Sequence, residues 1–286
     1  MTRDEAFQLV DWAAGEGWNP GLDDAALFWA TDPDAFVAAE RDGIVIGGGA
    51  VTSYNGAFGF MGLFIVRPEF RRRGLGHALW QARRTRMIAR LHPGASIGMD
   101  GVFTMQDYYA QGGFVFSHRH VRFRADVAVD DAPGLPASSG EVFALAGAAL
   151  DEAFGDVLDF DRTCFPADRA EFLRRWISQP NAAALGLRRT GRLAGYGVVR
   201  RCREGVKIGP LFAEDPAAAD TLFMHLSRCA AGGPLFLDVP DNNPGALELA
   251  GRHHMREVFG CARMYLGPPP ALAHQRIFGV TTLELG

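Results

Sequence analysis

The stretch VRPEFRRRGLGHALW, residues 66–80, follows directly on the apolar run of residues 62–66. The run predicts a buried strand, and Pro68 marks its end because proline cannot donate a hydrogen bond to a strand ladder. Leu75, Leu79 and Ala82 then recur at three- and four-residue spacing, which predicts an amphipathic helix. The stretch therefore predicts a strand, a glycine turn, and a helix whose first backbone N–H groups face whatever precedes them.

The composition is typical of a soluble globular protein. The chain has 286 residues, enough for two domains, with 48% hydrophobic and 22% charged residues and a net charge of −4. This charge argues against a nucleic-acid partner, which would require a basic face. No apolar run reaches the roughly 18 residues of a membrane span, and the first residues lack the pattern of a signal peptide. We therefore expect a cytoplasmic protein that has no membrane partner.

The cysteines, two histidines and a run of arginines are interpreted as structural residues, not as metal ligands or catalytic groups. The chain has four cysteines, whose spacing matches no zinc or Cys-x-x-Cys motif: Cys164, Cys202, Cys229 and Cys261. His118 and His120 would share one face of a strand, but two histidines without a third ligand are more often plain surface or core residues. We expect reduced thiols and no bound metal. A run of arginines is expected on the solvent side of the helix that follows Gly74: Arg83, Arg84, Arg86 and Arg90.

The chain contains an internal repeat. Residues 41–56, RDGIVIGGGAVTSYNG, and residues 189–205, RTGRLAGYGVVRRCREG, both predict a glycine-ended turn, a strand with two glycines and a second glycine-ended turn. Chance recurrence of such turns is the alternative. Three glycines of the first segment precede three of the second by 148 residues: Gly43, Gly47 and Gly49 correspond to Gly191, Gly195 and Gly197.

The order of elements after these segments is also shared. Each half continues with an apolar strand, a charged residue and a proline, a helix, and a short strand that ends in Asp100 or Asp238. Residues 124–141 are rich in Pro, Gly, Ser and Asp, as expected of a connection between domains. The sequence predicts an α/β fold of two similar domains, residues 1–126 and 127–286. Each domain would hold a mixed, mostly antiparallel sheet flanked by helices.

The motif Arg71-x-x-Gly74-x-Gly76 at the start of the predicted helix resembles the cofactor loop of the GNAT superfamily, the acyl-CoA-dependent N-acetyltransferases. Glycines let backbone N–H groups approach the pyrophosphate of coenzyme A, and the helix N-terminus adds the positive end of its dipole. A P-loop would need Gly-Lys-Ser/Thr at this place, and a dinucleotide site would need Gly-x-Gly-x-x-Gly. The sequence here matches neither pattern.

This resemblance implies how the cosubstrate, acetyl-CoA, would bind. The pyrophosphate is expected on the loop residues Arg71, Arg72, Arg73, Gly74, Leu75, Gly76 and His77. In such proteins the preceding strand and its neighbour form a central splayed pair. The gap between these two strands has the shape of a V. The pantetheine arm would enter this V and pair with the backbone of Phe64, Ile65 and Val66.

A second motif, DYYAQGGF at residues 107–114, resembles a helix near the end of the same domain in that superfamily. There, the tyrosine at the position of Tyr109 protonates the leaving thiolate, a role that suits a phenol with a pKa of about 10. The alternative is that Tyr109 only packs against its neighbours. Asp100 is the candidate base for deprotonating an incoming ammonium group, and it could equally cap the turn that follows it.

The second half resembles a degenerate copy of the first. After Pro216 it contains AAADTLFMHL, which has no glycine, and alignment of residues 242–255 with the first copy places Ala250 opposite Tyr109. The ending RIFGVTTLELG resembles that of a bacterial group of tandem proteins with one working half. We expect the degenerate half to form one wall of the acceptor pocket, although turn and surface positions are the alternative for the candidate wall residues. These are Asp238, Asn242, Asn243 and Tyr265.

Together these features predict an acetyl-CoA-dependent N-acetyltransferase that acts on a primary amine of an unidentified, small-molecule acceptor. Two alternatives stay open: transfer to a hydroxyl group on the same fold, and a non-catalytic protein that senses acyl-CoA. A chain with an internal pseudo-dimer is expected to be a monomer or a homodimer.

Overall fold

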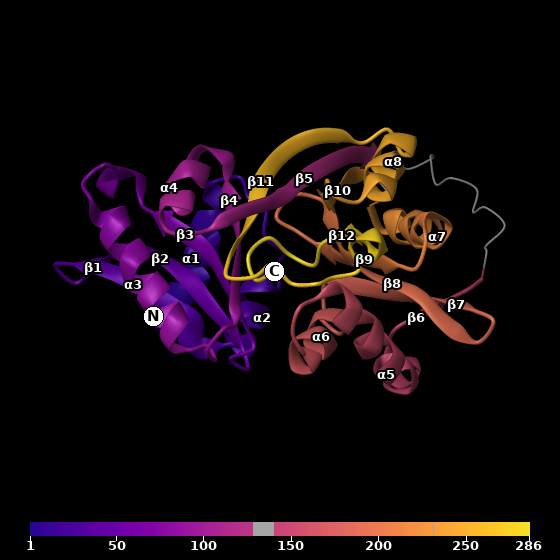
Figure 1. Ribbon diagram of the computed structural model, residues 1–286. Helices are drawn as coiled ribbons and strands as arrows, with labels where there is room; N and C mark the ends of the chain where they lie inside the picture. Colours follow the sequence, from indigo (N-terminus) through magenta and orange to yellow (C-terminus); the bar gives the residue numbers. More distant parts are fainter. Residues whose placement is uncertain (128–139, 231) are drawn as a thin grey trace.

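The computed structural model describes residues 1–127, 140–230 and 232–286 (Figure 1). The helices are α1 (Arg3–Gly15), α2 (Asp24–Thr31), α3 (Leu75–Ala89), α4 (Gln106–Gln111), α5 (Gly147–Cys164), α6 (Ala170–Ile177), α7 (Pro216–Ser227) and α8 (Pro244–Arg252). The strands are β1 (Phe36–Arg41), β2 (Ile44–Tyr54), β3 (Phe58–Val66), β4 (Ser96–Val102), β5 (Val115–Val127), β6 (Glu141–Ala144), β7 (Ala182–Arg189), β8 (Arg192–Arg201), β9 (Val206–Ala213), β10 (Gly233–Pro240), β11 (Arg256–Leu266) and β12 (Ile277–Gly279). Within these ranges no helix is long and apolar enough to cross a membrane, and the four cysteines are free.

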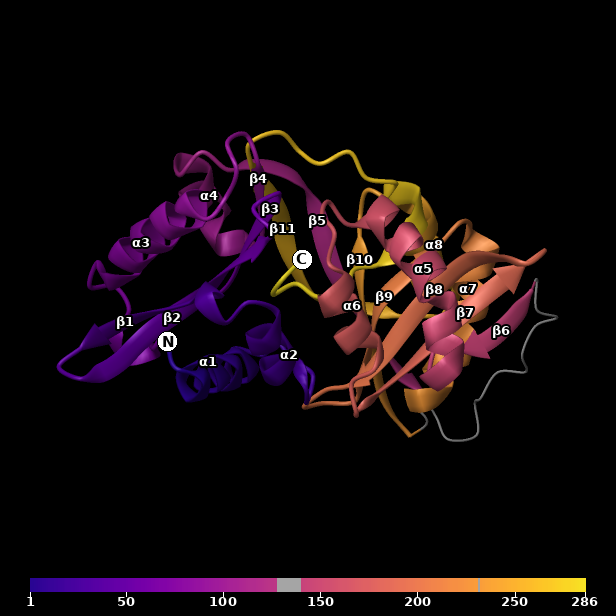
Figure 2. The ribbon, with the colours of Figure 1, turned by 90° about the horizontal axis from the view of Figure 1, so that it is seen from below.

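These strands form one mixed sheet in the order β1-β2-β3-β4-β11-β5-β10-β9-β8-β7-β6, and β12 pairs with β9. Neighbouring strands are antiparallel except for β3 with β4 and β9 with β10, which are parallel. Helices α1 to α4 lie with the N-terminal strands, and α5 to α8 lie with the C-terminal strands (Figures 1 and 2). This arrangement confirms the predicted mixed α/β class, with a single sheet that passes through both halves.

The centre of the sheet is built from exchanged strands. β11 of the C-terminal half lies between β4 and β5, and β5 lies between β11 and β10. At the middle of the antiparallel β5–β11 pair, His120 lies opposite Cys261. The halves consequently share a core, in which Met264 of β11 packs in the same cluster as Trp80 of α3. The division at residues 126 and 127 stays a prediction, and most of the predicted connection, 124–141, lies outside the described residues.

Each half contains two parallel strands that separate after a short stretch of pairing. Within the described residues, β3 pairs with β4 from Phe58 to Phe60, and β9 pairs with β10 from Val206 to Ile208. Beyond Phe60, β3 contains a bulge where its register against β2 shifts, and Leu63 there has φ of +53°. The predicted splayed pair is therefore present in both halves.

Arg83 of α3 supports this bulge from behind the sheet. Its side chain is buried, and it donates to the carbonyls of Ala50 (2.8 Å) and Gly62 (2.6 Å). The expectation of a solvated arginine was wrong for this residue, because the bulge presents carbonyl groups to the helix face that packs on the sheet. Gly49 provides the room, since a Cβ at that position would lie 2.4 Å from Nε of Arg83.

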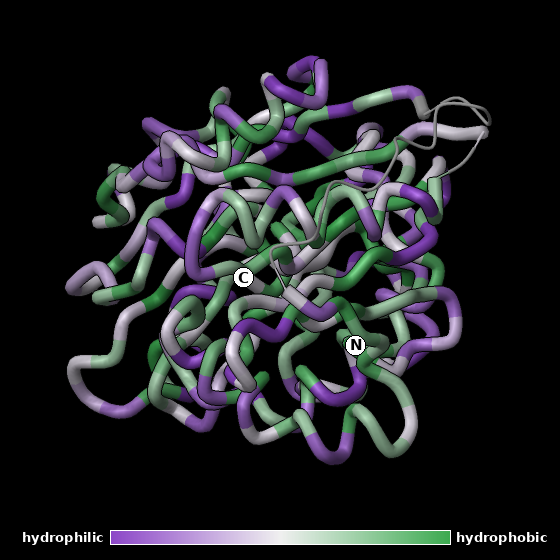
Figure 3. The backbone as a smooth tube through the Cα atoms, turned by 90° about the vertical axis from the view of Figure 1, so that its right-hand side faces the viewer, coloured by the Kyte–Doolittle hydropathy of each residue, from purple (hydrophilic) through white to green (hydrophobic). Residues whose placement is uncertain are grey.

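The end of the chain returns to the sheet as β12. It pairs with β9 at Leu211 and Phe212, which follow Leu63 and Phe64 by 148 residues. β12 therefore occupies the V of the C-terminal half, at positions that match the open part of the first V. Beyond β12 the chain continues inward, and three perpendicular views place the C-terminus near the middle of the molecule (Figures 1, 2 and 3). Leu285 is 1% exposed.

Candidate active site

An open groove runs along β3 to the N-terminus of α3. Gly74 is the N-cap of α3 with φ of +75°, and no side chain caps the helix. The N–H groups of Leu75 and Gly76, at the first turn, have no acceptor within the helix and form an anion-binding end. The groove is lined by Glu16, Trp18, Phe64, Ile65, Val66, Arg71, Arg72, Gly74, Gly76, His77, Val102, Met105, Tyr108 and Tyr109.

Most of the predicted coenzyme A residues lie together in this groove, while Arg73 and Leu75 of that set do not line it. Arg71 ties the loop to β3, because its Nε donates to the carbonyl of Val66 (2.7 Å), and its guanidinium also pairs with Glu16. A Cβ at Gly76 would lie 3.7 Å from Val66 Cγ2, an ordinary van der Waals distance, so the helix end lies close to the strand at this position. These residues fit an acyl-CoA with an extended arm and a diphosphate.

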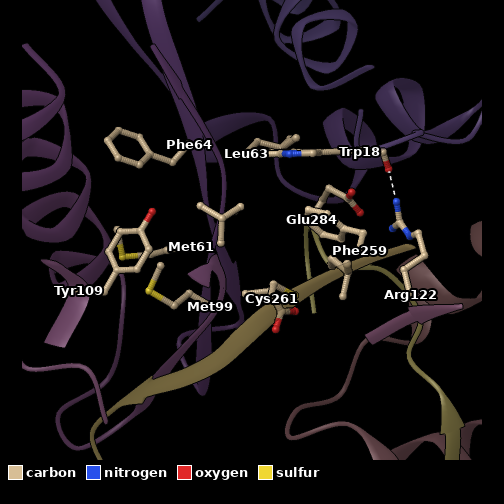
Figure 4. A pocket seen from close by; sticks show the side chains of 14 residues that line it. Trp18, Met61, Leu63, Phe64, Met99, Tyr109, Arg122, Phe259, Cys261 and Glu284 are labelled. Carbon is tan, nitrogen blue, oxygen red and sulfur yellow. Dashed lines mark hydrogen bonds between the residues drawn. The ribbon is translucent and has the colours of Figure 1, made fainter. Parts of the chain in front are cut away.

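A second, inner pocket opens from the groove. The two hollows share four lining residues: Trp18, Phe64, Val102 and Tyr109. The other residues of the inner pocket come from both halves of the chain: Met61, Gly62, Leu63, Met99, Asp100, Arg122, Phe259, Cys261, Leu283 and Glu284. In Figure 4, Tyr109 and Glu284 lie on different sides of this pocket. A reacting group that reaches Tyr109 from the groove would therefore face a molecule held in the inner pocket.

Tyr109 lies at the junction of the two hollows. It is buried, and its ring centroid lies 4.9 Å from that of Trp80. Gly101 of β4 gives the ring its space, since a Cβ there would lie 2.6 Å from Tyr109 Cε2. Burial raises the pKa of Tyr109 to about 12, so the hydroxyl holds its proton at neutral pH.

Asp100 lines the same pocket, but its carboxylate is already engaged. Arg263 donates to both oxygens, Nε to Oδ1 (2.9 Å) and Nη2 to Oδ2 (2.7 Å), and His120 Nδ1 lies 3.0 Å from Oδ1. Burial alone would raise the pKa of Asp100, but Arg263 and His120 together hold it well below its usual range. A carboxylate held in this way is a poor base, so we do not assign proton abstraction to Asp100.

The histidines of β5 are internal rather than exposed. His118 and His120 are both buried, and their Nε2 atoms lie 3.1 Å apart. Donor atoms of Asp100, His120 and Cys261 lie within 4.8 Å of one another, which is close enough for a metal ion. Because Arg263 already neutralises the carboxylate, this cluster has little need of a cation.

Comparison with known protein families gives two matches along the chain. The family described as "Acetyltransferase (GNAT) family" matches residues 3–99, and the one described as "Acetyltransferase (GNAT) domain" matches residues 157–279. The chain belongs to the GNAT acyltransferases. It carries two GNAT regions, one in each half, and members of this family use an acyl-CoA as cosubstrate.

Individual relatives match nearly the whole length of the chain. The holothin acyltransferase of Pseudoalteromonas sp. (strain SANK 73390) is 27% identical over 99% of this chain and 92% of its own length. A putative acetyltransferase from Pyrococcus horikoshii has a similar structure, with a TM-score of 0.81, 22% identity, and coverage of 100% of this chain and 94% of its own. A tandem GNAT protein from the clavulanic acid biosynthesis pathway has a TM-score of 0.63 and 16% identity, and the match covers 94% of this chain and 98% of its own.

The predicted wall residues of the second GNAT region do not line the inner pocket. Asp238 is buried in an ion pair with Arg122, and Asn243 caps α8 and donates to the carbonyl of Ile277 (2.9 Å). Asn242 is exposed, and Tyr265 is buried in another part of the core. We therefore do not assign these four residues to the acceptor wall.

The lining of the inner pocket was missed because it depends on the strand exchange and on the chain end. Phe259 and Cys261 reach the pocket only because β11 lies between β4 and β5. Leu283 and Glu284 belong to the ending RIFGVTTLELG, which the sequence singled out but to which it assigned no role.

The second GNAT region has no counterpart of the open groove within its described residues. The N-terminus of α7 is capped by its own Asp215, whose carboxylate accepts from the N–H of Ala218 (2.8 Å). A carboxylate at this place would repel a diphosphate. The V between β9 and β10 is occupied by β12, and Ala250 is a buried core residue of α8.

Proposed function

We propose that this protein is an acetyl-CoA-dependent N-acetyltransferase whose working site lies in the first GNAT region. The observation that carries this proposal is the continuity of two hollows at Tyr109: an open groove that ends at the uncapped α3, and an inner pocket beyond it. The likeness to a protein named an acyltransferase supports transfer of an acyl group rather than binding alone.

The groove would hold the cosubstrate in an extended form. The N–H groups at Gly74 to Gly76 and the dipole of α3 would bind the diphosphate, and Arg72 would add positive charge. The free edge of β3 after Phe60 would receive the pantetheine arm. When bound, the thioester supplies a carbonyl carbon that an amine can attack.

Tyr109 would act as the proton donor. Its pKa of about 12 keeps the hydroxyl protonated at neutral pH, and a departing thiolate near the junction of the two hollows would be within its reach. Arg83 and Gly101 position this part of the site, since Arg83 supports the β3 bulge and Gly101 leaves space for the ring.

Two alternative functions would give different results in an assay of free-thiol release from acetyl-CoA. A sensor would bind acetyl-CoA without releasing free thiol, and an O-acetyltransferase would release thiol with alcohols and not with amines. The inner pocket favours a transferase, because a sensor needs no acceptor space beyond the thioester. Free-thiol release from acetyl-CoA with a panel of amines and alcohols is the test. Release that requires an amine supports our proposal, and binding without release would overturn it.

The acceptor is proposed to be a small molecule, with no nucleic acid, metal or membrane involved. A cytoplasmic location and a monomeric or homodimeric state stay predictions.

A further inference from the structure

We propose that the second GNAT region serves to hold the C-terminal tail, residues 280–286, so that Glu284 binds the ammonium group of the acceptor and accepts its proton. The acceptor class that follows is a primary amine with one positive charge and an otherwise apolar body. This inference rests on the proposed acyl transfer and adds to it the proton acceptor, the acceptor chemistry and a role for the second region.

The tail is fixed at its start by the second region. β12 is held in the V by pairing with β9, where Ile277 lies opposite Phe212 and Gly279 opposite Leu211. Asn243 donates to the carbonyl of Ile277, and the N–H of Val280 donates to the backbone carbonyl of Asp238 (2.9 Å). In the first region the V is proposed to receive pantetheine, whereas in the second region the corresponding V holds β12 and so anchors the tail.

The tail is then fixed against the first region. A Cβ at Gly62 would lie 1.8 Å from the carbonyl oxygen of Glu284, so the tail can lie against β3 only because this residue is glycine. The Tyr54 hydroxyl of the first region donates to the carbonyl of Leu285 (2.9 Å), while Arg169 Nη1 of the second region donates to the carbonyl of Gly286 (3.4 Å). Backbone contacts on both sides of Glu284 thus determine where its side chain lies.

Three charged residues line the inner pocket, and among the described residues Glu284 is the one of these three that forms no ion pair. It is 4% exposed and accepts a hydrogen bond from the Thr282 hydroxyl, and no Lys, Arg or His nitrogen lies within 4.0 Å in the ion pairs described. The other two charged lining residues are neutralised, Arg122 by Asp238 and Asp100 by Arg263. A buried carboxylate without a cation is costly, and a bound ammonium group would compensate it.

The rest of the lining decides what the acceptor can carry besides its ammonium group. The apolar side chains of the inner pocket include Trp18, Met61, Leu63, Met99, Phe259 and Leu283. An acceptor carboxylate or phosphate would find no free cation in this lining, because all three nitrogens of Arg122 are occupied, by Asp238 and by the carbonyl of Trp18. A polyamine would lack a second carboxylate. Amino acids, nucleotides and polyamines are therefore disfavoured.

The proton balance follows from this placement. The Glu284 carboxylate accepts one proton from the ammonium group, and the nitrogen lone pair then forms the C–N bond to the thioester carbon. The C–S bond breaks, and the sulfur takes the proton of the Tyr109 hydroxyl. The extra proton on the product nitrogen returns to the tyrosinate, and Glu284 releases its proton to solvent. One ammonium and one thioester thus give one amide, one thiol and one proton.

Benzylamine is the probe for this proposal, and Glu284→Gln is the variant, because the amide keeps the shape and loses the charge. With acetyl-CoA, we expect the variant to lose at least about 100-fold in kcat/KM at neutral pH. The loss should shrink as the pH approaches the pKa of the amine, since a neutral amine needs no base. Glu257→Gln, an exposed change on β11, is the matched control and should behave as the unmodified protein.

A second comparison tests the acceptor class with the unmodified protein. 4-(Aminomethyl)benzoate, which adds a carboxylate to the same ring, should be at least about tenfold poorer than benzylamine. Equal use of the two amines would overturn the acceptor class.

The remaining outcomes distinguish a failure of the proposed role of Glu284 from a failure of the proposed acyl transfer. Turnover of benzylamine by the unmodified protein with no loss in Glu284→Gln would overturn the role of Glu284 and leave acyl transfer standing. A loss that does not change with pH would overturn its role as proton acceptor. Binding of acetyl-CoA without thiol release from any amine in the panel would overturn the proposed function itself.

Discussion

Arg122 of β5 and Asp238 of β10 form a buried bidentate ion pair, with Nε 2.6 Å from Oδ1 and Nη2 2.8 Å from Oδ2. Its counterpart is the pair between Arg263 of β11 and Asp100 of β4. Each pair joins an exchanged strand to a strand of the other half, and within each pair the two residues lie directly opposite in the sheet. The halves are therefore joined at the centre of the sheet by charge as well as by strand pairing.

The first prediction is that Asp238→Asn destabilises the whole chain. Removing the charge leaves the Arg122 guanidinium buried without a counter-ion, which typically costs about 3–5 kcal/mol. Asp241→Asn is the matched control, because Asp241 also pairs with an arginine of β5, Arg119, but at the surface, where such a pair contributes about 1 kcal/mol or less. Urea unfolding of both variants measures the difference, and equal losses would contradict this account.

The same carboxylate predicts a pH dependence. Burial by itself would raise the pKa of Asp238, but Arg122 lowers it to about 2, whereas an unfolded Asp titrates at about 3.9. The folded state thus binds the proton less readily than the unfolded state. The stabilisation from Asp238 should be complete above about pH 4 and should be lost as the pH falls towards 2. Urea unfolding across this range should show that the difference between unmodified protein and Asp238→Asn narrows towards low pH, and a constant difference would count against it.

A third prediction concerns Tyr109. Tyr109→Phe removes the hydroxyl and keeps the ring on Trp80 and Gly101, so acetyl-CoA affinity should change little while kcat falls by about 100-fold or more. Tyr265→Phe is the control, since Tyr265 is equally buried and does not line the groove or the inner pocket. Steady-state kinetics and calorimetric binding separate the two effects. A Tyr109→Phe protein with full kcat would show that the ring only packs.

The sequence was sufficient for the local features of this fold. Gly74 and Gly76 located the helix N-terminus at the groove, and the glycines at a spacing of 148 residues revealed the repeat that both GNAT regions confirm. Tyr109 was found by its place in a short motif, and the structure puts it at the junction of the groove and the inner pocket. These signals are local because each depends on a turn or on one helix.

The features that were missed depend on long-range pairing or on an irregular backbone. Nothing in the composition of β11 (Arg256–Leu266) indicates that it would lie between β4 and β5, two strands that end at Val102 and Val127. Arg83 lies four residues after Leu79 and four before Met87, on the buried face of α3, but its charge favoured an exposed position. It is buried because the β3 bulge offers carbonyl acceptors. Glu284 is a single carboxylate outside any helix or strand, so no periodic pattern marks it.

The central claim is that one acyl-CoA site lies at the N-terminus of α3, and Gly74→Val tests it most directly. Gly74 has φ of +75°, which a β-branched residue adopts only with strain, so the substitution is expected to distort the turn that presents the N–H groups of the groove. Gly191→Val is the matched control, because Gly191 has φ of +79° and equally open surroundings in a turn of the second region.

Calorimetric titration of the folded proteins with coenzyme A is the measurement, and the unfolding midpoints of the two variants provide the check on folding. We predict one site per chain in the unmodified protein and in Gly191→Val, and no measurable binding in Gly74→Val. Two sites per chain, or unchanged binding in Gly74→Val, would contradict the account.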